Sequence, residues 1–397
     1  MRLVDRPFGC QAEPPSNTST HAPQTFSSPA LPPSPFRRSS PTDPKPPANA
    51  LEIGCAAPLT GPLASAGQSV HRGARAAFEE VIAQGGINKR PVFLSVIDDG
   101  YVPERSAAAV KQLLARQEVL ALMSCVGTAN NAAAMPLIEA SDTLLLGPLT
   151  GAASLRKPDF NNVYHVRASY NDEVARLVDN LVDMHLDSLA VVYLDNGFGK
   201  ELHQVGIKAL KEKGLKAVAE VPVATDGKGL EASVKAVLEA RPSAMLLFTA
   251  GTTSTAMAQA IRKAAPSMPI AGLSVTFSSA AIKQLGAQAS GIATTLVVPD
   301  AMRTKFSLVR RYQKAMRAIG SEDFNPISFE TYINAQLMIE ALKGAGDNPT
   351  RTKIRQALAG IRKTDLGGFQ VDFSGSSHVG SSYVSLGVLS KSGRYIG

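Results

Sequence analysis

Short apolar runs alternate with longer amphipathic runs along residues 51–397. The apolar runs are rich in Val, Leu and Ile, and they predict β-strands that are buried on both faces. The longer runs repeat apolar residues at three- and four-residue steps, which predicts helices. The expected strands cover residues 51–56, 92–97, 119–123 and 143–146, then 189–194, 217–223, 244–249, 270–273 and 294–298, and finally 369–373 and 383–389. The expected helices cover residues 70–82, 104–116, 132–140, 200–213, 254–265, 306–319, 329–342 and 351–359.

This alternation predicts an α/β fold. Strands that are separated by helices form mainly parallel sheets flanked by those helices, with right-handed crossovers between the strands. One strand–helix series precedes Asn171 and a second follows it. Two lobes are therefore expected.

Two short loops that contain glycine and threonine each follow a predicted strand, at residues 126–130 and 147–152. Such loops lie at the carboxyl ends of neighbouring strands, where open α/β sheets bind small ligands. Glycine lets backbone N–H groups approach a ligand, and threonine adds a hydroxyl without a charge. The loops predict a site that holds a small polar molecule and has no group placed to attack it.

Composition narrows the classes of partner. The net charge of +8 is spread along 397 residues, with no basic block interleaved with aromatic residues, so a nucleic-acid partner is disfavoured. No apolar run reaches the roughly 20 residues of a membrane-spanning helix. The three cysteines, Cys10, Cys55 and Cys125, have no metal-site spacing, and Cys55 and Cys125 are expected to be small buried residues.

Residues 1–50 differ from the rest, because they hold twelve of the 26 prolines and few large apolar residues. Such a segment buries too little surface to offset its ordering entropy, which predicts disorder. It begins with Met1 and Arg2, but no apolar stretch of a signal peptide follows. The sequence leaves open whether this segment is a true tail or follows from a misassigned start codon.

Catalytic motifs are incomplete. Residues 197–199 read Gly-Phe-Gly, but Leu202 stands where a dinucleotide-binding loop has its third glycine. Residues 272–276 lack the second glycine of a nucleophile elbow. Asp98 and Asp99 are either an acid/base or metal pair, or one carboxylate that caps a loop beside a solvated one, and the second alternative is favoured. An enzyme is disfavoured, and neither a cofactor nor a metal is predicted.

At this point the motifs resemble a family, the type I periplasmic solute-binding proteins of the leucine/isoleucine/valine-binding class, which feed ABC importers. The resemblance runs from about residue 51 to residue 397. Its motifs lie at residues 57–62, 84–87, 98–99, 126–128, 147–152 and 198–199. Residues 166–173 are similar to a proteobacterial subgroup whose ligands are mostly unassigned.

The resemblance implies two lobes joined by three hinge crossings, with the ligand held in the cleft by hinge closure. Lobe one would comprise residues 51–168 plus 300–366, and lobe two residues 169–299 plus 367–397. The hinges would lie near Arg167, Val298 and Gly367. The resemblance also implies a periplasmic location and a partner permease in the inner membrane.

The resemblance further implies which residues contact the ligand. In the first lobe, backbone N–H and hydroxyl groups would hold a carboxylate. The matching positions are Gly127, Thr128, Ala129, Leu149, Thr150 and Gly151. From the second lobe, Phe198 would cover the ligand. The loop at residues 249–253, which contains Gly251, offers hydroxyls where family members often have an aromatic residue. Tyr101 either reaches the cleft or lies on the surface.

One position departs from the family pattern. Members that bind α-amino acids have an acidic residue near the fourth strand end of lobe two, and the approximate match here is Ser274. Because an unpaired buried ammonium is costly, we expect a carboxylate-bearing or neutral polar molecule, such as an aromatic or aliphatic acid, rather than a plain branched-chain amino acid. The predicted function is the solute-binding component of an ABC importer. The alternative is a ligand sensor of the same fold that regulates a partner protein without transport.

Overall fold

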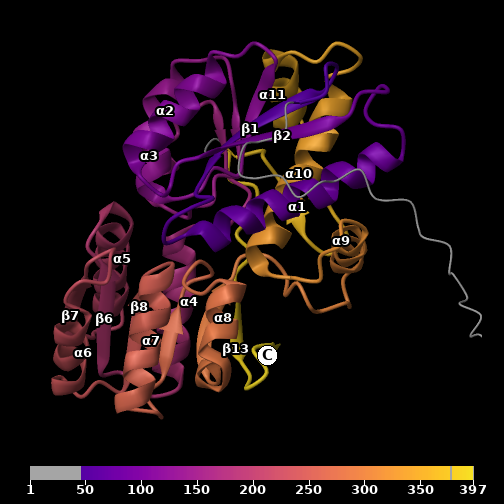
Figure 1. The fold of residues 1–397 in the computed structure, drawn as a ribbon. Coiled ribbons are helices and arrows are strands. Elements are labelled where there is room, and N and C mark those ends of the chain that lie inside the picture. Colours follow the sequence, from indigo (N-terminus) through magenta and orange to yellow (C-terminus); the bar gives the residue numbers. More distant parts are fainter. Residues whose placement is uncertain (1–45, 376–377, 397) are drawn as a thin grey trace, which may run out of the picture. The chain divides into compact units, whose positions relative to one another are not determined.

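Two β-sheets organise the chain in the computed structural model, which describes residues 46–375 and 378–396 (Figure 1). The first sheet has five parallel strands in the order β2-β1-β3-β4-β5. These are β1 (Leu51–Ala57), β2 (Val92–Asp98), β3 (Val119–Met123), β4 (Leu145–Leu146) and β5 (Val163–Tyr164). Its helices are α1 (Ala64–Ala83), α2 (Pro103–Leu114) and α3 (Thr128–Glu139), with a 3-10 turn at Ala153–Leu155.

The second sheet has seven strands in the order β14-β13-β10-β9-β8-β6-β7. The parallel strands are β6 (Leu189–Leu194), β7 (Ala219–Val223), β8 (Ala244–Phe248), β9 (Ile270–Gly272) and β10 (Ile292–Leu296). Strands β13 (Ser385–Leu389) and β14 (Tyr395–Ile396) add an antiparallel edge. The helices of this part are α4 (Tyr170–Asp183), α5 (Gly197–Glu212), α6 (Leu230–Glu239), α7 (Thr252–Ala264) and α8 (Ser279–Leu285), followed by a 3-10 turn at Gly286–Ala289.

Three late helices return to the first sheet. They are α9 (Ser307–Ala318), α10 (Pro326–Gly344) and α11 (Arg351–Ala359). Helix α10 packs on α1 and α11, and α11 contacts β3. Figure 1 shows α10 and α11 beside β1 and β2, although they are far apart in the sequence.

Local sequence signals explain how these elements form. Strand β1 is buried at every position, as its continuous apolar run predicts. Helix α4 begins with a capping box, in which the Ser169 hydroxyl accepts from the Asp172 backbone N–H and the Asp172 carboxylate accepts from the Ser169 backbone N–H.

Cys55 and Cys125 are buried, as expected for small apolar residues. Within the described residues, no helix has both the length and the apolar character to cross a membrane.

The predicted alternation of strands and helices is confirmed, with mainly parallel sheets flanked by helices. Strands β5 and β14 and helices α4, α6 and α8 were not among the predicted elements, and the two strands, of two residues each, are too short for a period to be recognised. The strand predicted at residues 369–373 is reduced to β12 (Gln370–Val371), which pairs with β11 (Thr364–Asp365) in a separate hairpin. The Asp365 carboxylate accepts from the N–H groups of Gly367 and Gly368, both at positive φ, and this turn joins the two strands of the hairpin. The disorder predicted for residues 1–50 falls largely on residues 1–45, which lie outside the described part of the chain.

The predicted hinge near Arg167 falls between β5 and α4, and the one near Val298 falls between β10 and α9. The third crossing is less simple, because His165 N–H donates to the His378 carbonyl (2.9 Å) and Gly380 N–H donates to the His165 carbonyl (2.7 Å). Phe373 also packs edge-on against Tyr164 of β5, with ring centroids 5.3 Å apart. We propose that the third crossing lies between Gly380 and β13 rather than at Gly367. The other lobe boundaries stay predictions.

Helices α1 and α10 approach so closely that a glycine is required between them. A Cβ atom on Gly73 would lie 2.1 Å from the Ser328 carbonyl oxygen. We expect Gly73→Ala to lower the free energy of unfolding by about 1–3 kcal/mol, because overpacking outweighs the gain in helix propensity. Denaturant unfolding measures the change.

Gly344→Ala at the end of α10 is the matched control, since its Cβ would meet a single methyl carbon at 3.1 Å. A Gly73→Ala protein as stable as the wild type would show that the two helices are not held at this distance.

Candidate functional site

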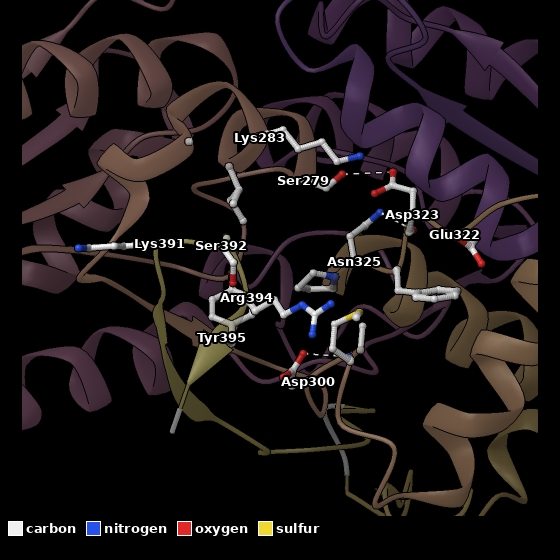
Figure 2. A pocket seen from close by; sticks show the side chains of 17 residues that line it. Ser279, Lys283, Asp300, Glu322, Asp323, Asn325, Lys391, Ser392, Arg394 and Tyr395 are labelled. Atoms are coloured by element: carbon white, nitrogen blue, oxygen red, sulfur yellow. Dashed lines mark hydrogen bonds between the residues drawn. The ribbon is translucent and has the colours of Figure 1, made fainter.

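One cavity lies between α8, the β13–β14 turn and the segment before α10, and has a volume of about 340 Å³ (Figure 2). Its basic lining residues Lys283, Lys391 and Arg394 and its acidic residue Glu322 are exposed to solvent. The Ser279 hydroxyl donates to the Asp323 carboxylate across it, at 3.2 Å. Exposed groups of mixed charge are ordinary surface, so size alone does not make this groove the candidate site.

The smaller cavity, of about 40 Å³, is built from segments that follow strands of both sheets. Thr128 and Leu149 follow β3 and β4 of the first sheet, and Phe198 and Ser274 follow β6 and β9 of the second. The carboxyl ends of parallel strands are where α/β proteins bind ligands, and all four of these side chains are buried. We therefore take this cavity as the candidate site.

The structure divides the ten predicted site residues into two groups. Six of them line the cavity, and four do not. The lining residues are Tyr101, Gly127, Thr128, Leu149, Phe198 and Ser274. The others are Ala129, Thr150, Gly151 and Gly251. Contact with a ligand stays a prediction for all of them.

Thr150 lies behind the cavity wall and supports it. Its hydroxyl lies 2.7 Å from the hydroxyl of Thr128 and accepts from the Ala152 N–H at 3.2 Å. The side chain of Thr150 is fully buried. Gly151 is needed for packing, because a Cβ there would lie 2.7 Å from the Tyr170 backbone nitrogen.

Gly251 and Ala129 lie where the two sheets' loops meet. Gly251 has φ of +72°, and a Cβ there would lie 2.7 Å from the Pro62 carbonyl oxygen. A Cβ on Gly197 of α5 would come within 3.9 Å of the Ala129 methyl group. Both positions therefore allow backbones from the two sheets to come close.

The aromatic residues enclose the cavity. Phe198 is buried and packs edge-on against Tyr170, with ring centroids 5.6 Å apart. Its neighbour Gly199 is required because a Cβ would lie 2.0 Å from the Leu194 carbonyl oxygen, which gives the Gly-Phe-Gly motif a packing role. Tyr101 lines the cavity rather than the surface, and burial raises the pKa of its hydroxyl.

The paired aspartates hold the loops in place. Asp98 accepts hydrogen bonds from the Leu59 N–H (2.8 Å) and the Thr60 hydroxyl (2.6 Å), so the predicted loop cap is confirmed. The prediction that its neighbour is solvated is wrong, because Asp99 is fully buried. It accepts from the Tyr101 N–H (2.8 Å) and the Asn130 side-chain amide (3.2 Å). The turn at Tyr101, with φ of +64°, folds α2 and α3 over this carboxylate.

A favourable site for an anion lies at the start of α3. Gly127, with φ of +97°, precedes the helix, and Thr128 is its first residue. The first N–H groups of a helix have no partner within it, and the helix dipole is positive at that end. A carboxylate at this wall would receive backbone N–H groups and the Thr128 hydroxyl without a buried cation.

Sequence reasoning missed a buried charged cluster at the cavity. Arg167, predicted only as a hinge, is 1% exposed, and its Nη2 donates to Glu173 Oε1 at 3.0 Å and to the Ser274 hydroxyl. Its Nη1 lies 3.6 Å from Oε2 of Glu330 on α10. The guanidinium also lies over the Tyr170 ring, 5.6 Å from its centroid. One signal in the sequence could have indicated this cluster: Glu330 lies among apolar residues of the helix predicted at residues 329–342.

Burial and pairing set the ionisation of this cluster. Burial alone would lower the pKa of Arg167, but Glu330 and Glu173 outweigh it and the pKa is raised. Burial raises the pKa of Glu330, and Arg167 offsets part of that rise. Among the described residues, no group of His, Cys, Asp and Glu side chains is arranged to hold a metal ion.

Comparisons with known proteins agree with this architecture. A profile of the family described as "Periplasmic binding protein" matches residues 50–394. The solved substrate-binding periplasmic protein from Ralstonia solanacearum has a TM-score of 0.80 and 27% sequence identity, and the match covers 87% of this chain and 99% of that one. A possible leucine/isoleucine/valine-binding protein from Rhodopirellula baltica has a TM-score of 0.83 at 25% identity, covering 89% and 98% of the two chains.

A curated relative is also similar. The Leu/Ile/Val-binding protein homolog 3 of Brucella melitensis is 26% identical over 188 residues, which are 46% of this chain and 50% of that protein. The match therefore spans about half of the relative's length. Together these similarities confirm the resemblance that the sequence motifs indicated.

The structure predicts a structural role for Thr150. Thr150→Val removes a buried hydroxyl partner of Thr128, so we expect the free energy of unfolding without ligand to fall by about 1–3 kcal/mol. Denaturant unfolding measures this, with the exposed Thr304→Val as control. Unchanged stability combined with lost binding would mean that Thr150 contacts the ligand itself.

The buried side chain of His165 should make the stability of the protein depend on pH. Burial, reinforced by nearby Arg156, lowers its pKa from 6.5 to about 3. As the pH falls, His165 is therefore protonated in the unfolded chain before it is protonated in the folded one. The free energy of unfolding is highest above pH 6.5 and falls toward pH 3, by up to about 1.4 kcal/mol per pH unit. His165→Gln keeps a donor for the Leu155 carbonyl and removes this titration. Unfolding measured between pH 7 and pH 5 should fall less steeply in the variant, and equal slopes would contradict the assignment.

Proposed function

The chain belongs to the periplasmic binding protein family, and from that premise we propose that it is the solute-binding component of an ABC importer. It captures a small polar or carboxylate-bearing molecule, an amino acid or related organic acid, in the cleft between the two lobes. The observation that carries the proposal is the buried cavity whose walls come from strand ends of both sheets. A molecule enters such a cavity only if the two walls separate, so the proposal includes hinge motion.

The polar groups of the walls favour a ligand with an acidic or carbonyl end. The first turn of α3 and the Thr128 hydroxyl supply donors on the first wall. On the second wall, the Ser274 hydroxyl accepts from Arg167, which leaves its own proton free to be donated to an acceptor on the ligand. The aromatic ring of Phe198 and the side chain of Leu149 supply apolar contact.

Transport requires a partner and a location. We propose a permease in the inner membrane as the partner and the periplasm as the location, in keeping with the family. The relatives named above are binding proteins, and no feature of the cavity favours the sensor alternative or a catalytic role.

A thermal-shift screen against amino acids, organic acids, amides and urea tests the proposal. A ligand present at 100 times its dissociation constant should add about 2.7 kcal/mol of stability. Calorimetric titration then measures the affinity of each hit. The proposal fails if no compound of any class raises the melting temperature.

Thr128→Val tests the first wall. We expect the affinity for a carboxylate-bearing hit to fall about tenfold to a hundredfold, because a hydrogen bond to a charged group is lost. The exposed Thr304→Val is the matched control and should bind as the wild type does. Equal affinities for Thr128→Val and the wild type would place the carboxylate elsewhere.

A further inference from the structure

One stretch of the molecular surface gathers positive charge. Residues 301–321 hold six basic residues and no acidic residue, which departs from the even spread of charge expected for the whole chain. The stretch covers α9 and the turn before it, and all six basic side chains are exposed. We call these six residues the basic face: Arg303, Lys305, Arg310, Arg311, Lys314 and Arg317.

The opposite side of α9 is packed into the protein, so the basic face is a fixed surface. Tyr312 is buried, its hydroxyl lies 2.5 Å from the Ser328 hydroxyl, and its ring packs against Phe329 with centroids 4.7 Å apart. Helix α9 also packs on α1, and the two lie side by side (Figure 1). The side chains that point away from these contacks therefore keep a defined spacing.

Arg310, Lys314 and Arg317 lie in one row along the helix. They recur at steps of four and three residues, which places them on one side of α9 over about 10 Å of its axis. Arg310 Nη1 donates to the backbone carbonyls of Thr304 at 2.6 Å and Lys305 at 2.9 Å. The turn before the helix is therefore held next to this row, and its basic residues extend the same surface.

Much of this charge has no acidic partner. Arg311 pairs with Glu80 at 2.9 Å, and Arg317 pairs with Glu322 at 3.7 Å. Three other members of the basic face make no ion pair with any described residue, namely Lys305, Arg310 and Lys314. Like charges four residues apart on a helix repel each other, so an anionic surface placed against this row would relieve the repulsion.

The basic face fits a partner that is recognised by charge rather than by shape. Protein partners usually take apolar or aromatic anchors, and single-stranded nucleic acids take aromatic rings for stacking. Helix α9 offers neither, because its other exposed residues are Ser307 and Ala318, while Tyr312 is buried and Phe306 packs against Gly368. An anionic lipid surface attracts clustered lysines and arginines through charge alone.

We propose that the basic face adsorbs to an anionic lipid surface. The lipid headgroups supply the negative charge that Lys305, Arg310 and Lys314 lack within the described part of the chain. This inference goes beyond the proposed ligand-binding function, and no residue of α9 lines the candidate cavity. In a binding protein that delivers its ligand to a membrane permease, such adsorption keeps the protein close to that membrane.

Cosedimentation of the full chain with lipid vesicles tests the proposal. One set of vesicles contains equal parts of phosphatidylglycerol and phosphatidylcholine, and the other contains phosphatidylcholine alone. We expect binding to the first set only, because each basic residue near an anionic surface strengthens binding about fivefold. Binding should disappear when the ionic strength is raised from about 0.01 M to about 1 M, since the screening length falls from about 30 Å to about 3 Å.

A triple variant locates the contact. Lys305→Gln, Arg310→Gln and Lys314→Gln together should weaken binding to the anionic vesicles about a hundredfold. The matched control combines Lys208→Gln, Lys216→Gln and Lys235→Gln, which lie at exposed positions elsewhere and change the net charge equally. The control should bind as the wild type does. Equal weakening in the two triple variants would show that net charge drives adsorption and would overturn the role of the basic face.

The wild-type comparison does not depend on the folding of any variant. If the wild type does not bind the anionic vesicles at low ionic strength, the proposal is wrong, and an acidic protein becomes the class of partner to test. Equal binding to both sets of vesicles would also contradict it. The thermal-shift screen for ligands and the vesicle assay succeed or fail separately, because the basic face and the cavity share no residue.

Discussion

The buried guanidinium of Arg167 is the interaction on which the architecture around the cavity depends. It lies at the first crossing between the sheets and contacts α4 through Glu173, the segment after β9 through Ser274 and α10 through Glu330. A charge this deeply buried is tolerated only when it is paired, and removing it would leave two acids buried without compensation, at a cost of about 3–5 kcal/mol. The Arg167 side chain therefore links the first crossing to the segments that form both walls of the cavity.

Some side chains of the loops around this cluster line the cavity, and others support them from behind. Thr128 and Thr150 are similar residues in similar loops, yet Thr128 reaches the cavity and Thr150 bonds to its hydroxyl from behind. Asp98 and Asp99 divide in the same way, since one caps an outer loop and the other is buried beneath Tyr101. The Thr128 hydroxyl is thus backed by a buried partner that limits its freedom, which is how a binding site is kept in a defined geometry.

Most of the fold was predictable because its signals are local. The apolar run of β1 and the three- and four-residue spacing of apolar residues in α1 specify their elements within a few residues. Strand β5 has only two residues and forms by pairing with β4, so no local period marks it. The hairpin at residues 364–371 was not predicted for the same reason, since its two strands have two residues each.

The sequence by itself determined the alternation of strands and helices, the family, and the placing of glycine and threonine loops at strand ends. The tertiary structure decided which polar groups meet at the cavity. Glu330, Arg167 and Ser274 lie on separate segments of the chain, and their meeting follows from long-range packing of α10 and the crossing, which no local pattern records. The glutamate that lines the cavity was therefore visible in the sequence as a residue, but its position at the cavity was not.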